Sequence, residues 1–209
     1  GILDLVAPGL NAPVALTGQL ITLYAFVYGL GVPVTIALSS HIGRRTVMIT
    51  AMTVYALASM LTLLVNDFWT FVPLRIIQAL SGGTAVVTAL STAATLAGTQ
   101  RQGRAIATVI MGFTASLIVA VPLAREIALR LGWHAVFPLV GLLGLATALS
   151  QRFVLPVLSP AASIPLREQF ALLRRPAILG GLTVTVLWMA GYVMTYSYLT
   201  PYLIDVQRL

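Results

Sequence analysis

The sequence predicts an all-α membrane protein, a helical bundle of about six full membrane-spanning helices preceded by a truncated first helix. Of its 209 residues, 59% are hydrophobic and only 8% are charged, whereas soluble domains have about 25% charged residues. Several uncharged runs also reach the roughly 20 residues that an α-helix needs to cross the hydrocarbon of a bilayer. The mean hydropathy of +0.99 agrees with this class.

The expected elements follow one another with mostly short connections. Residues 1–8 are too short to span and are expected to be the end of a helix, broken at Asn11-Ala12-Pro13. The full spans are expected at residues 20–38, 46–66, 68–100, 105–124, 133–151 and 176–204. A proline-containing connector precedes the last span, and its residues 166–175 are expected to form a short helix on the membrane surface. We therefore expect a transmembrane bundle at 1–150, a cytoplasmic linker at 151–175 and the first helix of a second bundle at 176–209.

The charges indicate the orientation of the chain. All twelve basic residues are Arg, and most fall in loops, so the net charge of +7 is interpreted as a topology signal rather than as a nucleic-acid surface. Counted over alternate loops, eight Arg lie on one side and two on the other. The eight are Arg44, Arg45, Arg101, Arg104, Arg152, Arg167, Arg174 and Arg175, and the two are Arg130 and Arg208. The side with eight Arg is expected to be cytoplasmic.

The sequence does not favour an enzyme, a metal site or a cofactor. It has no cysteine, and its two histidines, His41 and His134, are far apart and have no acidic neighbours. Ser81-Gly82-Gly83 superficially resembles the serine turn of an intramembrane protease. Such a site needs a histidine base at matching depth, and both histidines lie at the ends of expected spans. A hydrolase is kept as the least favoured alternative.

Arg75 is the outstanding candidate for a functional residue because it lies inside an expected span. A charge there costs roughly 2.5–3.5 kcal/mol on insertion scales, so it normally faces a cavity or a partner. We expect Arg75 to line a substrate cavity with Gln78, which follows three residues later on the same helix face. The alternative is an Arg whose side chain reaches the outer interface. Tyr192 and Tyr196 share a face of the last span and are further cavity candidates.

Small residues recur in the span at 105–124. Gly112, Ser116 and Ala120 are spaced four apart, and Pro122 follows them. Such a stripe lets a second helix approach closely, so these residues are expected to form a helix-packing face. Glu126 and Arg130, at the outer end, are expected to form a local ion pair rather than a proton site.

Four stretches resemble motifs of the major facilitator superfamily. The turn at residues 36–45 is similar to that family's cytoplasmic Gly-x-Leu-x-Asp-Arg-x-Gly-Arg-Arg loop, because Leu38, Gly43, Arg44 and Arg45 match it. Ile36, Ser40 and His41 replace its Gly, Asp and Arg. The run from Arg75 to Ala79 resembles the Arg-x-x-Gln-Gly motif of helix 4. Val121-Pro122 stands where the antiporters have Gly-Pro, and Tyr196-Ser197-Tyr198-Leu199-Thr200-Pro201-Tyr202-Leu203 is similar to a pattern of sugar efflux permeases.

The resemblance covers the whole chain and lies closest to the drug/proton antiporter branch, in particular to arabinose-type sugar efflux permeases. It implies a fragment from the end of helix 1 to helix 7 of a multi-pass transporter of the bacterial inner membrane. It further implies secondary active efflux of a sugar or drug-like molecule through the bilayer, with protons as the expected coupling ion. Ser40, His41, Gly43, Arg44 and Arg45 are expected to act in gating, although Ser40 cannot carry the charge of the usual Asp. A non-transporting fragment or structural partner is the alternative.

Overall fold

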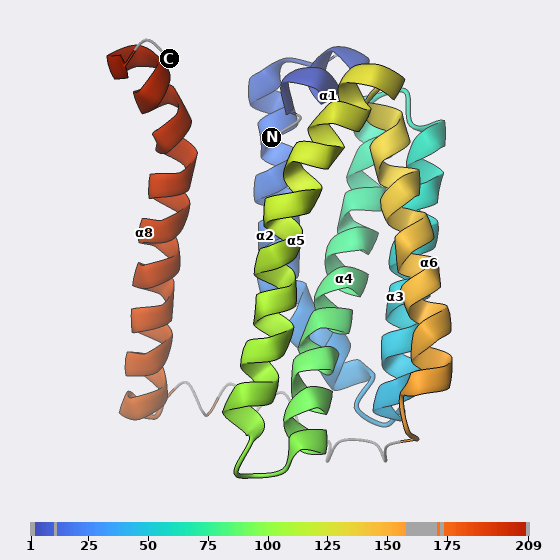
Figure 1. Cartoon of the computed structure of the whole chain (residues 1–209), viewed down its shortest axis with the longest axis vertical. Helices are drawn as coiled ribbons and strands as arrows, with labels where there is room; N and C mark the ends of the chain where they lie inside the picture. Colours follow the sequence, from blue (N-terminus) through green and yellow to red (C-terminus); the bar gives the residue numbers. More distant parts are fainter. Residues whose placement is uncertain (1–2, 11, 158–170, 172–173, 208–209) are drawn as a thin grey trace. The chain divides into compact units, whose positions relative to one another are not determined.

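The computed structural model describes the backbone of residues 3–10, 12–157, 171 and 174–207, and it describes side chains within residues 6–10, 12–13, 16–157, 171 and 174–191. The chain divides into two compact units, Gly1–Ser163 and Ile164–Leu209, and each is described by itself. Within the described part every regular element is a helix (Figure 1). The predicted all-α class is therefore confirmed.

The first unit contains six α-helices and two short 3₁₀ helices in its described residues. They are α1 (Leu3–Gly9), α2 (Val14–Leu38), α3 (Arg44–Leu61), η1 (Thr62–Leu64), α4 (Phe68–Ala97), α5 (Gln102–Leu131), η2 (Trp133–Ala135) and α6 (Val136–Val154). The second unit contains α8 (Pro176–Gln207).

Local chemistry explains several helix ends. The Asp67 carboxylate accepts a hydrogen bond from the backbone N–H of Thr70 at 3.0 Å and so caps the start of α4. At the other end of α4, Gly98 has a φ of 69°, and Gly132 after α5 has a φ of 83°. Glycine adopts this left-handed backbone without a steric penalty, so both glycines stop their helices and turn the chain back.

Five helices in the described residues are long and apolar enough to cross a membrane. They are Leu16–Leu38, Arg44–Leu64, Phe68–Ala97, Gln102–Leu131 and Trp133–Val154. In α8 the apolar stretch with described side chains, Pro176–Gly191, is shorter. The predicted surface helix at 166–175 falls largely outside the described residues. The division into a bundle, a linker and a second bundle stays a prediction.

Two predicted boundaries were wrong by several residues. The span at 105–124 belongs to a helix that continues to Leu131, because Glu126 and Arg130 pair on successive turns and sustain the helix beyond the apolar stretch. The first full helix begins at Val14 rather than at residue 20, directly after Pro13. Proline before the first helical turn is compatible with a helix start, because the N–H it lacks would have no helical partner there.

α4 is the central helix of the first unit. It packs against α2, α3 and α5, and α3 packs in turn against α6 (Figure 1). Close approach of α3 and α6 depends on glycine, since a Cβ added at Gly141 would lie 2.8 Å from the Ala56 carbonyl oxygen. This arrangement encloses the middle of α4 with side chains from several helices.

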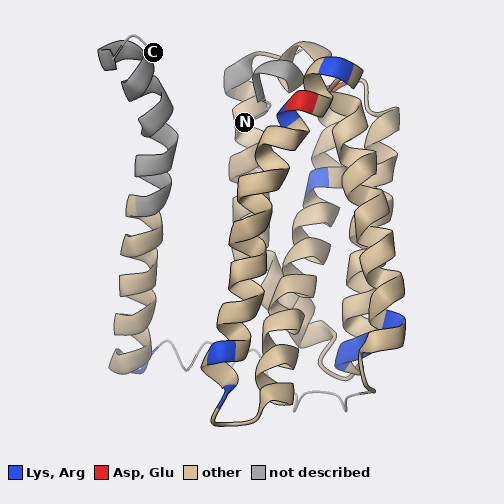
Figure 2. Ribbon diagram, viewed as in Figure 1, with Lys and Arg blue, Asp and Glu red and all other residues tan. Residues whose placement is uncertain are grey.

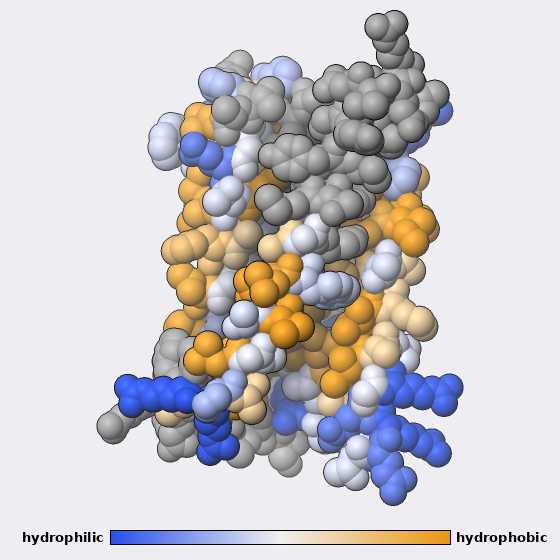
Figure 3. All heavy atoms as spheres, turned by 90° about the vertical axis from the view of Figure 1, so that its left-hand side faces the viewer, coloured by the Kyte–Doolittle hydropathy of each residue, from blue (hydrophilic) through white to orange (hydrophobic). Residues whose placement is uncertain are grey.

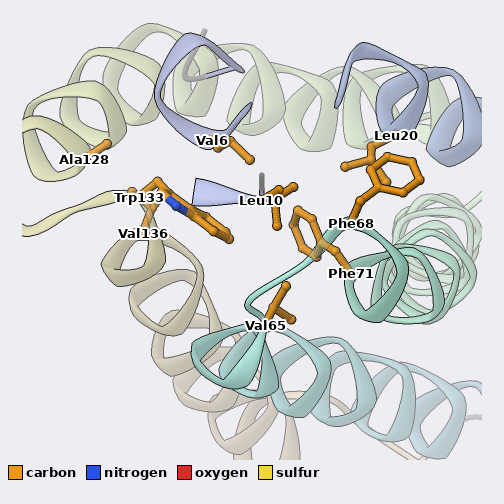
Figure 4. Close-up of a cluster of buried hydrophobic side chains, with 9 residues drawn as sticks. All are labelled: Val6, Leu10, Leu20, Val65, Phe68, Phe71, Ala128, Trp133 and Val136. Carbon is orange, nitrogen blue, oxygen red and sulfur yellow. The ribbon is translucent and has the colours of Figure 1, made fainter. Parts of the chain in front are cut away.

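Apolar side chains close one end of the bundle (Figure 4). The cluster consists of Val6, Leu10, Leu20, Val65, Phe68, Phe71, Ala128, Trp133 and Val136. The Phe71 ring lies 5.9 Å from the Trp133 ring and 5.4 Å from the Phe137 ring, measured between centroids, which is the usual range for aromatic pairs. Gly9 is required beneath Trp133, because a Cβ there would collide with the indole nitrogen. The cluster joins α1 to η2 and to the start of α4.

Charged residues lie mainly at the helix ends of the first unit. Figure 2 shows basic residues at the lower ends of α3, α5 and α6, and an acidic residue near the upper end of α5. In the space-filling view, apolar side chains cover the middle of the coloured surface and long hydrophilic side chains extend at the lower end (Figure 3). Arg75 is the exception, because it is a basic residue that lies within α4 rather than at a helix end.

Candidate functional site

The buried polar groups of the described chain concentrate on α4. Gln78, Ser81, Thr84, Thr88 and Thr92 are each less than a tenth exposed. Their spacing of three or four residues places them along one face of the helix. The Thr84 hydroxyl lies 2.6 Å from the Thr35 hydroxyl and so links α4 to α2. α4 therefore carries a continuous polar face that neighbouring helices cover.

Three aromatic rings surround the Arg75 guanidinium. Its central carbon lies 4.9 Å from the centroid of Phe71, 5.1 Å from Phe137 and 5.8 Å from Tyr24. These rings come from α4, α6 and α2, so three helices contribute to the enclosure. A cation within about 6 Å of an aromatic face is attracted to it, and more strongly where water is excluded. The rings thus hold the charge of Arg75 inside the bundle.

A chain of polar contacts leads from Arg75 across α4 to α3. Arg75 Nη1 donates to Gln78 Oε1 at 3.4 Å, and Gln78 Nε2 donates to Ser59 Oγ at 3.4 Å. The Ser59 hydroxyl donates to the Tyr55 carbonyl at 2.8 Å. Both contacts of Gln78 are long for hydrogen bonds, although its side chain is only 1% exposed. The structure therefore brings Arg75 and Gln78 together, as their spacing predicted.

The Arg75 side chain has unused hydrogen-bonding capacity. Its Nε is buried and has no partner among the described residues. A guanidinium carries five N–H donors and does not release a proton in a protein. Arg75 can consequently orient a polar or anionic group or stabilise a nearby carboxylate, but it cannot carry protons itself.

Two tyrosines converge beside this group. A Cβ placed on Gly82 would lie 3.2 Å from Cδ2 of Tyr55 and 3.4 Å from the Tyr24 hydroxyl oxygen. Gly82 therefore admits tyrosines from α2 and α3 to the same surface of α4. The polar tips of these rings can donate or accept hydrogen bonds, and their faces can stack on an apolar or sugar-like surface.

A small cavity lies between α2, α3 and α4. Its volume is about 310 Å³. Its polar wall comprises Thr35, Ser39, Thr50, Ser81 and Thr84. The Ser81 hydroxyl donates to the Ile77 carbonyl at 2.6 Å, and no histidine is among the residues that line the cavity. The geometry gives the serine no general base.

The turn before α3 connects three helices. Ser40 donates to the Ala37 carbonyl at 2.7 Å, His41 is exposed, and Gly43 precedes the first turn of α3. Arg44 donates to the Ser91 carbonyl at 3.4 Å and to the Thr95 hydroxyl on α4. Arg45 donates to the Arg152 carbonyl on α6. The two arginines tie α3 to its neighbours, while the gating role of the turn stays a prediction.

The small-residue stripe of α5 has no neighbouring helix among the described residues of the first unit. Gly112, Ser116, Ala120 and Pro122 are exposed, and a Cβ on Gly112 would meet no atom within 4 Å. The expected packing face is therefore not brought against another helix within the first unit and stays a prediction. Further along α5, Arg130 and Glu126 form the expected ion pair at 2.6 Å with both side chains more than half exposed. The side chains of Tyr192 and Tyr196 lie outside the described residues.

Sequence reasoning missed most partners of Arg75. Phe71 lies four residues before it on the same helix face, a spacing that could have identified it. Tyr24, Ser59 and Phe137 come from other helices, and no local pattern marks them. Their contribution follows from the order in which the helices pack.

These features define a multi-pass helical membrane protein with an enclosed cationic and aromatic site. Comparison with known proteins gives the family: the Major Facilitator Superfamily matches residues 1–209, and the chain belongs to it. This is a family of transporters rather than enzymes, so the prediction that the chain is not an enzyme is confirmed. Membership agrees with the membrane location that the long apolar helices indicate.

Three relatives illustrate the similarity. The chain is 43% identical over 206 residues to the MFS-type transporter YbcL of Bacillus subtilis, covering 99% of this chain and 53% of the relative. It is 30% identical over 203 residues to the inner membrane transport protein YdhP of Escherichia coli K12, covering 97% and 52%. It is 26% identical over 208 residues to a probable sugar efflux transporter of Pasteurella multocida, covering 100% and 52%. The chain thus spans about half the length of the curated relatives it matches.

Proposed function

We propose that the protein to which this chain belongs exports a small sugar-like or drug-like molecule by secondary active transport, and that Arg75 and Gln78 contact that molecule. The observation that carries the proposal is the Arg75 side chain, which is enclosed by three rings within a membrane-spanning helix and has an unpartnered Nε. A charge in this position costs roughly 2.5–3.5 kcal/mol on insertion scales and normally faces a cavity or a partner. Similarity to proteins named as sugar efflux transporters supports the substrate class.

The proposed binding chemistry follows from the side chains around Arg75. Its guanidinium and the Gln78 amide offer hydrogen-bond donors and acceptors to hydroxyl groups, while Tyr24 and Phe71 offer ring faces. Aromatic rings beside a few placed polar groups are a combination that is typical of small-molecule sites. These groups suit a planar drug-like cation less well than a sugar, because the positive charge of Arg75 would repel the cation.

Proton coupling needs a group that releases protons, and Arg75 is not one. Among the acidic residues with described side chains, Asp67 caps α4 and Glu126 pairs near the outer end of α5. Neither lies in the middle of a span. We propose coupling to protons on the family resemblance of the turn and of α4, with Arg75 tuning a carboxylate contributed from elsewhere in the protein.

The turn at residues 36–45 is the proposed gate. Ser40 cannot form a charge-based lock, so the ties of Arg44 to α4 and of Arg45 to α6 would hold one state. Such ties are hydrogen bonds to carbonyl and hydroxyl oxygens, and these cost less to break than a buried ion pair.

Transport by the reconstituted protein tests the proposal. Proteoliposomes would be loaded with buffer at one pH and diluted into another, and the uptake of radiolabelled arabinose, glucose and lactose would be followed, with ethidium as a cationic comparison. We expect sugar uptake that is stimulated by the pH gradient and abolished by an ionophore. Uptake that does not change with the pH gradient would refute the proton coupling. Absence of flux for every probe would refute the transport proposal for these substrates.

A non-transporting role remains the second candidate for these 209 residues taken alone, because they span about half the length of their relatives. This candidate predicts no flux when only residues 1–209 are reconstituted. Flux from that preparation would eliminate it.

A further inference from the structure

A groove on the outer surface of the first unit runs between α3 and α6 at their arginine-rich ends. Its wider part has a volume of about 450 Å³. Arg45, Thr46 and Thr50 line it from α3, and Arg152 and Phe153 line it from α6. Among the described residues that line it, none is acidic. Two cationic groups and two hydroxyls thus share one open, positively charged pocket.

A second cavity of about 330 Å³ continues from the first, since Ile49 and Arg152 line both. The remaining wall of this second cavity is almost wholly apolar, with Leu145, Ala148 and Leu149 from α6. It lies nearer the middle of the two helices than the arginines do. A polar pocket therefore opens at the membrane boundary and an apolar trough leads from it along the membrane-spanning part.

The surroundings of the groove are suited to lipid. Phe153 is 77% exposed and Val157 is 83% exposed beside the arginines, and Leu149 is 60% exposed beside the trough. Arg45 also donates to the Arg152 carbonyl, which fixes its guanidinium at the junction of the two helices. Exposed apolar groups next to snorkelling arginines are typical of the boundary between acyl chains and headgroups.

We propose that this groove binds an anionic phospholipid, whose phosphate headgroup lies between Arg45 and Arg152 and whose acyl chain follows the trough along Leu145 and Leu149. Charge complementarity selects the headgroup, because guanidinium groups form paired hydrogen bonds with phosphate oxygens. Basic pockets between membrane-spanning helices are recognised sites for such lipids. The bound lipid would join α3 to α6 at the end where the turn at 36–45 lies, and the inference does not depend on the transported substrate.

Quenching by brominated lipids tests the site locally. Phe153→Trp places a reporter in the groove, and its signal is the difference from the parent protein, whose own tryptophans are Trp69, Trp133 and Trp188. The purified protein would be reconstituted in phosphatidylcholine vesicles with increasing fractions of brominated phosphatidylglycerol, and in the converse mixture with brominated phosphatidylcholine. We expect the added tryptophan to be quenched preferentially by phosphatidylglycerol. Equal quenching by both lipids would overturn the proposal.

Charge variants sharpen the test. Each arginine near an anionic lipid contributes about fivefold to association, so Arg152→Gln should reduce the preference about fivefold and Arg45→Gln with Arg152→Gln about 30-fold. Arg152→Gln keeps the backbone carbonyl to which Arg45 donates, so it remains informative if the double variant misfolds. The matched control, Arg101→Gln with Arg104→Gln, removes two arginines near the start of α5 and should leave the preference unchanged.

Two results of this series would contradict a lipid site. An equal loss in the control would mean that general charge, rather than the groove, attracts the lipid. Loss of the preference on adding millimolar inorganic phosphate would mean that the groove takes a free anion.

Discussion

α4 and α5 are both thirty residues long, and both would be identified as membrane spans, yet the structure uses them differently. In the most apolar stretch of α4, 44% of the residues are buried. In the corresponding stretch of α5, none of the residues is buried. α4 keeps its polar groups enclosed, including Gln78 and a series of hydroxyls. α5 presents its small residues on an open face. Length and hydropathy therefore identify a span, whereas its neighbours decide what that span does.

The physical difference between α4 and α5 lies in how many buried polar groups each helix must provide with hydrogen-bond partners. Two buried hydroxyls of α4, those of Ser81 and Thr84, donate to carbonyls of their own helix, and the Gln78 side chain reaches across to Ser59 on α3. In hydrocarbon an unsatisfied polar group is costly, so these contacts restrict how α4 can pack. The hydroxyls of Thr114 and Ser116 on α5 also donate to carbonyls of their own helix, but both residues are exposed, so they do not restrict how α5 packs within the first unit.

The largest stability difference should come from matched glycine substitutions. A Cβ at Gly83 of α4 would lie 2.2 Å from Cγ2 of Val32 and 2.8 Å from Cε2 of Tyr28. Both are stiff side chains, so Gly83→Ala should destabilise the fold by about 1–3 kcal/mol. Gly112→Ala on α5 meets nothing and should be neutral or stabilising by up to about 1 kcal/mol. Thermal unfolding of the purified protein in detergent measures both, and equal effects would remove the contrast between the helices.

Removal of the buried polar side chain of Gln78 should lower the stability of the fold by an intermediate amount. Gln78→Leu deletes the link between Arg75 and Ser59 and leaves their polar groups less satisfied, so it should cost about 1–2 kcal/mol. The control on α5 is Thr114→Val, because the Thr114 hydroxyl is exposed and donates only to the Ile110 carbonyl. It should change stability by less than about 0.5 kcal/mol. A larger loss at Thr114 than at Gln78 would contradict the account.

The smallest effect should come from the cap of α4. Hydrogen bonds from the Thr70 backbone N–H and hydroxyl lower the pKa of Asp67 below its ordinary value of 3.8. The ionised form is favoured in the folded state, so the stabilisation is present above pH 3.8 and is lost as the pH falls through the lower folded-state pKa. Unfolding temperatures of the parent and of Asp67→Asn, measured between about pH 6 and pH 3, should converge at the acid end. A constant difference across that range would refute this role.

Much of the fold could be predicted from composition and spacing alone. The apolar runs predicted the helices, and Gly98 and Asp67 stand where α4 ends and begins. The boundary at Ala124 was wrong because charged residues end a hydrophobic span without ending a helix. Glu126 and Arg130 continue α5 for two further turns.

The site was predictable only along one helix. Arg75 and Gln78 are three residues apart, so their contact follows from helical geometry. Tyr24 and Phe137 reach Arg75 because α2 and α6 lie beside it, and sequence spacing does not encode that packing. The stripe from Gly112 to Ala120 shows the converse, because its pattern indicates close packing while the described residues of the first unit supply no partner for it.

Transport by Arg75 variants tests the central claim, that the enclosed face of α4 serves substrate, most directly. Sugar flux into proteoliposomes would be compared for the parent protein, Arg75→Ala, Arg75→Lys and the control Arg104→Ala. We predict at least about a tenfold loss for Arg75→Ala, since a hydrogen-bonded charged group contributes about 1.5–3 kcal/mol. Arg75→Lys should recover only part of it, because a point charge replaces the planar fork, and Arg104→Ala should match the parent. Unchanged flux in Arg75→Ala, with protein present at parental levels, would contradict the claim.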